Sequence, residues 1–75
     1  MSNVYIIAGV AVQTRSLQSG DMAVWHRLSD TVRNVVEPIC RGKGYWDDKY
    51  HNWVIKAGNV QSVLVDLEMA QRESA

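Results

Sequence analysis

One stretch of the chain, Gly42 to Ile55, limits the fold more than any other. It reads GKGYWDDKYHNWVI and holds four of the six aromatic residues, two of the lysines and one of the two histidines. The adjacent Asp47 and Asp48 favour a turn, because a short carboxylate can accept hydrogen bonds from backbone amides just ahead of it. Trp, Tyr, Val and Ile on either side suit a pleated, half-buried surface. The stretch therefore predicts a β-hairpin, with strands over 44–46 and 50–56 and a turn over 47–49.

The size of the chain restricts what it can do. Its 75 residues suffice for one small domain, 1–75, and a domain of this size buries only about 60% of the surface that its unfolded chain exposes. A second domain and a deep cleft with walls of its own are excluded. A hydrophobic content of 47% favours a folded chain, and a formal net charge of zero disfavours a strongly basic nucleic-acid clamp.

The cysteine content and the N-terminus bear on location. Cys40 is the only cysteine, so an internal disulfide is excluded, which favours a reduced, cytoplasmic protein. The N-terminal run MSNVYIIAGVAV is long enough for the apolar part of a signal peptide, but no positive charge precedes it and no clear cleavage site follows. It is too short to span a membrane. We therefore expect no membrane association and assign Val4 to Val12 to one core strand, with Gly9 as a bulge or a close backbone approach.

A first helix is predicted from Asp21 to about Glu37, after a polar loop over 13–20. Ser19 or Asp21 would cap it, and Pro38 would end or kink it. Its apolar residues recur at helical spacing and form one stripe. These residues are Trp25, Leu28, Val32, Val35, Val36 and Ile39.

A second amphipathic helix is predicted from about Asn59 to Gln71, with Asn59 as its N-cap. The tail, 72–75, is expected to fray. The predicted order is therefore β-α-β-β-α. Amphipathic helices need a sheet to cover, so the simplest solution is an α+β two-layer domain, a three-stranded sheet with both helices on one face.

The hairpin resembles a known small module. The pattern is Gly, one or two residues, Trp-Asp or Trp-Asn, five residues, Trp, and then Val or another β-former, matched here by Gly44, Trp46, Asp47, Trp53 and Val54. The module occurs in short domains of phage, plasmid and primase- or helicase-associated proteins, and a looser version occurs in the HARP domains of annealing helicases. The resemblance covers roughly residues 30–70 and implies a role linked to nucleic acid or to the replisome.

The hairpin also carries the candidate binding residues. Trp46 and Trp53 have equal offsets from the turn and are expected to face the same side, as core residues. Tyr45 and Tyr50 would then be more exposed, beside several cations. Aromatic rings beside cations suit single-stranded nucleic acid, and they also suit a protein-binding hot spot. The predicted binding residues are Arg41, Lys43, Tyr45, Lys49, Tyr50 and His51.

No pattern in the chain predicts catalysis, a metal or a cofactor. His26, His51, Cys40 and Asp47 lack the spacing of metal ligands, and no third group is positioned to support a Cys–His nucleophile. The glycines at 42 and 44 lack the context of a phosphate-binding loop. We therefore expect a protein that is not an enzyme.

Three functional hypotheses follow. The first is a non-enzymatic binding module whose hairpin contacts nucleic acid or a nucleic-acid-processing protein complex. The second is an inhibitor from a phage or another mobile element, of the anti-CRISPR type, that acts by protein–protein contact. The third is a homodimeric structural protein, because a chain of 75 residues has little core to spare.

Overall fold

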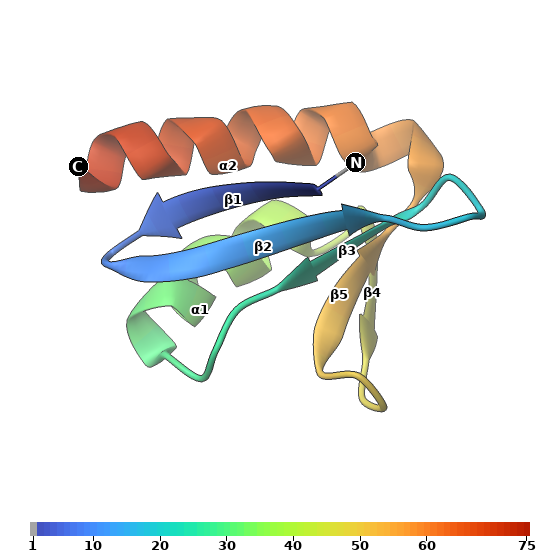
Figure 1. The fold of residues 1–75 in the computed structure, drawn as a ribbon, viewed down its shortest axis with the longest axis horizontal. Coiled ribbons are helices and arrows are strands. Elements are labelled where there is room, and N and C mark those ends of the chain that lie inside the picture. The colour runs from blue at the N-terminus through green and yellow to red at the C-terminus, as the bar shows by residue number, and fades with distance from the viewer. Residues whose placement is uncertain (1) are drawn as a thin grey trace.

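An antiparallel sheet of five strands dominates the computed structural model, which describes residues 2–75 (Figure 1). The strand order is β1-β2-β3-β5-β4, and each neighbouring pair is antiparallel. The predicted α+β class is confirmed, but the predicted three-stranded sheet and the order β-α-β-β-α are wrong. The elements are β1 (Ser2–Ile7), β2 (Val10–Ser16), β3 (Met22–Trp25), α1 (Asp30–Cys40), β4 (Gly44–Asp47), β5 (Asn52–Ile55), the 3-10 helix η1 (Ala57–Asn59) and α2 (Val60–Ser74).

The first error concerns residues 4–12, which form two strands and not one. Ile7 pairs with Val10 across a two-residue loop. Ala8 and Gly9 have φ angles of 51° and 78°, and two successive positive φ angles are the mark of the hairpin turn that matches the twist of the flanking strands. Gly9 was the visible sign of this turn, since glycine adopts positive φ without steric cost.

The second error concerns the predicted helix from Asp21. Residues 22–25 form β3, which pairs with β2 on one side and with β5 on the other. The helix begins only at Asp30, where Ser29 is the N-cap and its Oγ accepts a hydrogen bond from the Val32 amide at 3.4 Å. Trp25 and Leu28 thus lie outside the helix and are 41% and 103% exposed. Pairing with two neighbours outweighed the helical spacing of the side chains.

The rest of α1 follows the predicted apolar stripe. Val32 and Val36 are fully buried, and Val35 and Ile39 pack beside them. Cys40, which was not part of the predicted stripe, is also fully buried. The helix continues through Pro38 to Cys40. Pro38 lies two residues before the end, so little of the helix lies beyond the hydrogen bond that proline cannot donate.

Side chains alternate between the two faces of the sheet, and one face carries the core. Figure 1 shows α1 behind the sheet and α2 alongside β1. The buried side chains of the strands meet those of the helices in a single cluster. This cluster consists of Ile7, Val10, Val12, Met22, Val24 and Ile55 from the sheet, and Val32, Val36, Cys40, Val63 and Leu67 from the helices.

The C-terminal helix is longer than predicted, because its last turn is tied to the edge of the sheet. Gln71 Oε1 accepts a hydrogen bond from the Ile6 amide at 2.6 Å, and Ser74 Oγ donates one to the Ile6 carbonyl at 3.3 Å. Residues 72–74, which were expected to fray, are therefore helical. In the part of the chain that the structure describes, no helix has both the length and the apolar character that a membrane span requires.

Candidate functional site: a hairpin with two faces

The aromatic stretch forms the predicted hairpin, with a turn over 48–51 and a second strand that begins at Asn52. Asp47 Oδ1 accepts hydrogen bonds from the amides of Lys49 and Tyr50, at 2.9 and 3.3 Å. The side chain of Asp47 thus organises the turn in the way the sequence predicted. The turn lies later than predicted: Asp47 belongs to β4, whereas Tyr50 and His51, predicted to begin the second strand, belong to the turn, where His51 has a φ angle of 52°.

The two indoles lie opposite each other on the side of the sheet that faces the helices. Trp46 pairs with Trp53 in the register, and the ring centroids are 5.6 Å apart with an interplanar angle of 73°. Trp53 packs against the core cluster. Trp46 is 45% exposed, and its Nε1 donates to Asp48 Oδ1 at 2.8 Å. The expectation that both indoles belong to the core therefore holds only for Trp53, since Trp46 lies on the edge strand.

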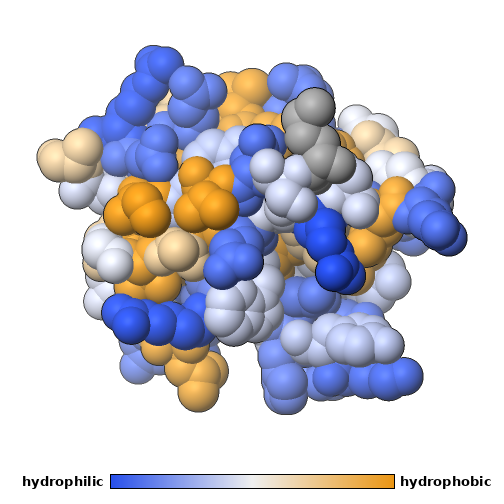
Figure 2. All heavy atoms as spheres, in the orientation of Figure 1, coloured by the Kyte–Doolittle hydropathy of each residue, from blue (hydrophilic) through white to orange (hydrophobic). Residues whose placement is uncertain are grey.

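The opposite side of the hairpin is continuous with the face of the sheet that bears no helix, which we name the open face. One row of paired residues crosses all five strands on this face. The row consists of Ser2, Arg15, Ala23, Val54 and Tyr45. Figure 2 shows hydrophobic side chains over the β1–β2 end of the molecule and hydrophilic ones over the tip of the β4–β5 hairpin.

Three aromatic rings project from the open face. Trp25, Tyr45 and Tyr50 are 41%, 50% and 62% exposed, and all three line a shallow groove of about 600 Å³. Ala23 and Val54 are buried and form its floor. The expectation that the two tyrosines are exposed is confirmed.

Cations lie next to two of these rings. Lys49 Nζ is 5.3 Å from the centroid of the Tyr50 ring, and Lys56 Nζ is 5.3 Å from that of Tyr45. Arg15 lines the same groove. So does Asn52, whose Oδ1 is buried and has no hydrogen-bond partner within residues 2–75. The open face thus combines flat rings, cations and an amide in one place.

Lys43, a predicted binding residue, has a structural contact instead. Its Nζ donates to Ser62 Oγ at 2.7 Å and to Asp66 Oδ2 at 3.2 Å, both on α2. Its carbonyl accepts hydrogen bonds from the Lys56 amide and from Asn59 Nδ2. Asn59 therefore holds the base of the hairpin and does not cap α2 with its side chain. Lys43 fastens the hairpin to the second helix.

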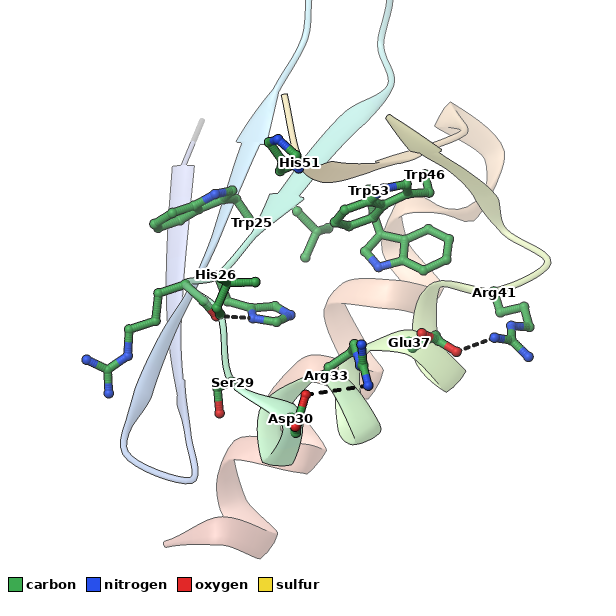
Figure 3. Close-up of a pocket in the computed structure, with 13 residues that line it drawn as sticks. Trp25, His26, Ser29, Asp30, Arg33, Glu37, Arg41, Trp46, His51 and Trp53 are labelled. Atoms are coloured by element: carbon green, nitrogen blue, oxygen red, sulfur yellow. Dashed lines mark hydrogen bonds and ion pairs between the residues drawn. The ribbon is translucent and has the colours of Figure 1, made fainter. Parts of the chain in front are cut away.

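The remaining two predicted residues, Arg41 and His51, line a different hollow on the helix side of the hairpin. This hollow, which we name the tryptophan groove, has a volume of about 720 Å³. Its side chains come from the end of β3, from the β3–α1 connection, from α1 with its C-cap residue, and from the hairpin (Figure 3). They include Trp46, Trp53, His26, Leu28, Arg33 and Glu37. Trp25 of β3 lines this groove as well as the open face.

The six predicted residues thus do not form one surface. Three of them lie on or beside the open face, two line the tryptophan groove, and Lys43 binds α2. The prediction also missed Trp25 and Arg15. Once residues 22–25 are recognised as a strand, simple alternation places Trp25 on the same face as Ala23, opposite the buried Val24. The signal was present, but the helical interpretation of this segment concealed it.

No group of three or more His, Cys, Asp and Glu residues that could hold a metal ion occurs within residues 2–75. Burial raises the pKa of the Cys40 thiol to about 12, and the nearby Lys43 offsets this only in part. The thiol therefore stays protonated at neutral pH and is a poor nucleophile.

Comparisons of the chain with protein-family models, with curated proteins and with solved structures found no match. The resemblance to the Trp-Asp…Trp module thus stays a prediction. The geometry of the two faces is the basis for a functional proposal.

Proposed function

We propose that this protein is a non-enzymatic binding module that contacts single-stranded nucleic acid through its open face. The observation that carries the proposal is the set of three exposed rings, Trp25, Tyr45 and Tyr50, on a sheet face without a helix. Unstacked bases bind to such rings because every base has a flat π face, and each stacking contact contributes about 1–3 kcal/mol.

The cations beside the rings support the same ligand. Lys49 and Lys56 lie where the phosphates that flank a stacked base would be attracted, and Arg15 extends this line across β2. Three cations are few for a protein that binds nucleic acid, so the affinity should be modest and should fall with salt with a shallow slope.

A double helix suits this face less well than a single strand. The rings can stack only on bases whose faces are free, and the bases of a duplex are already stacked on one another. A preference for single strands is therefore part of the proposal.

A protein partner is the second candidate. Val4 and Ile6 extend the open face with aliphatic surface, at 58% and 49% exposure. Together with Trp, Tyr and Arg, such surface has the composition of a protein-binding hot spot. The hypothesis of an inhibitor that acts by protein contact belongs to this class.

Titration of labelled single- and double-stranded oligonucleotides, followed by fluorescence anisotropy at low and high salt, tests the first candidate. We expect single strands to bind more tightly, Tyr45→Leu and Tyr50→Leu each to weaken binding by about tenfold, and Arg15→Ala to reduce the salt slope by about one. Arg72→Ala on α2 removes a cation from another part of the molecule and serves as the control. A wild-type protein that binds no oligonucleotide at low salt would exclude nucleic acid and leave the protein partner.

A further inference from the structure

The helix α1 presents a stripe of alternating charges to the tryptophan groove. Asp30, Arg33 and Glu37 are spaced three and four residues apart, which places them on one side of α1, and Arg41 follows four residues later as the C-cap residue. All four line the groove. Arg33 pairs with Asp30 at 3.4 Å, and Arg41 pairs with Glu37. Each of these side chains retains at least 36% exposure, so each can still meet a second partner.

This stripe is complementary to itself when it is reversed. In an antiparallel pair of α1 helices, Asp30 of one copy faces Arg41 of the other, and Arg33 faces Glu37. An α-helix rises 1.5 Å per residue, so the two residues of each facing pair lie at the same height along the axis to within about 1.5 Å. A parallel pair in the same register would bring like charges together at all four positions. The pattern therefore selects one arrangement of two identical helices.

An apolar side chain stands at the end of this stripe. Leu28 is 103% exposed and lines the same groove, two residues before α1 begins. In the antiparallel arrangement, the start of one helix lies beside the end of the other, where Trp46 lines the groove and is 45% exposed. Leu28 of each copy then covers the indole of its partner, and burial of apolar surface is the main favourable contribution to association.

We propose that the tryptophan groove is the interface of a symmetric homodimer, in which two α1 helices lie antiparallel and each Leu28 packs against the partner's Trp46. A second copy fits better than an unrelated protein, because the charges complement themselves and the chain has a net charge of zero. A two-fold axis repeats every contact between the two copies. The Leu28–Trp46 contact and the two charge pairs, Asp30–Arg41 and Arg33–Glu37, therefore each occur twice in the dimer. The α1 helix and most of the open face lie on opposite sides of the sheet, but the dimer interface and the proposed nucleic-acid surface share Trp25, which lines both grooves.

Sedimentation equilibrium over a series of protein concentrations tests the dimer directly. We expect the mass to approach about 17 kDa, twice the 8.5 kDa of one chain. Leu28→Asp should raise the dissociation constant by about tenfold or more without affecting the fold, because Leu28 is fully exposed in the monomer. Met69→Asp adds the same charge at a half-exposed apolar position of α2 and should leave the dimer intact. A mass of one chain at all concentrations, or equal effects of the two substitutions, would overturn the proposal.

A charge-reversed variant tests the register. The combined changes are Asp30→Arg, Arg33→Glu, Glu37→Arg and Arg41→Glu. They reverse all four charges, so opposite charges still face each other within one variant chain and between two variant chains. We expect this variant to dimerise with itself but to mix with the wild type at least about tenfold less readily. Circular dichroism verifies its fold. Free mixing of the two forms would show that α1 does not face α1 in this way. If the variant does not fold, Arg33→Glu alone should weaken the wild-type dimer, and an unchanged dissociation constant would contradict the register.

Discussion

The two hairpins of this protein differ in how much of their side-chain surface they bury. The β1–β2 hairpin pairs over six positions and contributes Ile7, Val10 and Val12 to the core. The β4–β5 hairpin pairs over only four positions and keeps three of its four aromatic rings about half exposed. The first hairpin therefore contributes mainly to the core, and the second leaves most of its aromatic side chains accessible at the surface.

The hairpins also differ in how α2 holds them. Gln71 and Ser74 bind the outer edge of β1 near the end of the strand, which blocks part of an edge that could otherwise pair with another chain. Lys43, by contrast, ties only the base of the second hairpin to α2. The α2 helix thus covers part of the edge of the β1–β2 hairpin, the structural hairpin. It leaves the tip of the β4–β5 hairpin, the aromatic hairpin, accessible.

The largest effect is expected from Ile7→Ala in the structural hairpin. Ile7 is 1% exposed, and truncation of a buried isoleucine costs about 2–5 kcal/mol. Trp46→Ala in the other hairpin removes one edge-to-face contact of a half-exposed ring and should cost about 1 kcal/mol. Urea unfolding followed by circular dichroism measures both. A larger loss for Trp46→Ala would mean that the aromatic hairpin, too, is a main part of the core.

The second effect concerns the strand pairing of the aromatic hairpin. A Cβ atom at Gly44 would lie 1.9 Å from the carbonyl oxygen of Val54, so the backbone must shift. We expect Gly44→Ala to cost about 1–3 kcal/mol, as overpacking does elsewhere. Near-ultraviolet circular dichroism should report a loosened Trp46–Trp53 pair. Gly58→Ala, where an added Cβ meets no atom within 4 Å, is the control and should change little.

The third effect concerns the thiol at the end of α1. The ordinary pKa of Cys40 is 9.0 and burial raises it to about 12, so above pH 9 the unfolded chain loses a proton that the folded chain keeps. This contribution to stability is complete below pH 9 and declines by about 1.4 kcal/mol per pH unit as the pH rises toward 12. Burial also raises the pKa of Tyr5, which acts in the same direction.

Urea unfolding at pH 8 and pH 10 isolates the contribution of this thiol. We expect the wild type to lose about 1.4 kcal/mol more than Cys40→Ala between these two values. Equal losses would mean that the thiol ionises as readily in the folded protein as in the unfolded chain. The junction of α1 and the aromatic hairpin would then be more open to water than the core beside β1 and β2.

The smallest effect distinguishes the anchor of the aromatic hairpin from its tip. Lys43→Ala removes a partly exposed ion pair and should cost about 0.2–1 kcal/mol of stability, with little change in oligonucleotide affinity once the folded fraction is taken into account. Lys49→Ala should leave stability unchanged and weaken oligonucleotide binding. Thermal unfolding and anisotropy titration of both variants measure the two effects. The opposite pattern would return Lys43 to the binding surface.

Sequence patterns correctly predicted the features that depend on contacts between residues close together in the chain. The turn at Asp47 depends on a side chain bonding to amides two and three residues ahead. The buried sides of both helices follow from helical spacing. The predicted exposure of Tyr45 follows from alternation along its strand, and Tyr50 is exposed because it lies in the turn. All of these depend on contacts within a few residues.

Residues 22–25 show where local patterns failed. MAVW continues the helical spacing of the following residues, and nothing nearby forbids a helix. It forms a strand because β2 and β5 lie on either side and satisfy its backbone groups, and β5 lies about thirty residues further along the chain. This pairing added a strand to the sheet and moved Trp25 from the predicted core to the open face.

The sequence by itself determined that this chain has an aromatic hairpin and two amphipathic helices in one α+β domain. Only the tertiary structure decided that the sheet has five strands, that Lys43 is an anchor, and that the tyrosines and tryptophans of the hairpin serve two separate faces. The physical reason is the range of the interactions. Turns and helix periodicity are set by neighbouring residues, whereas strand pairing and burial depend on segments that only the folded chain brings together.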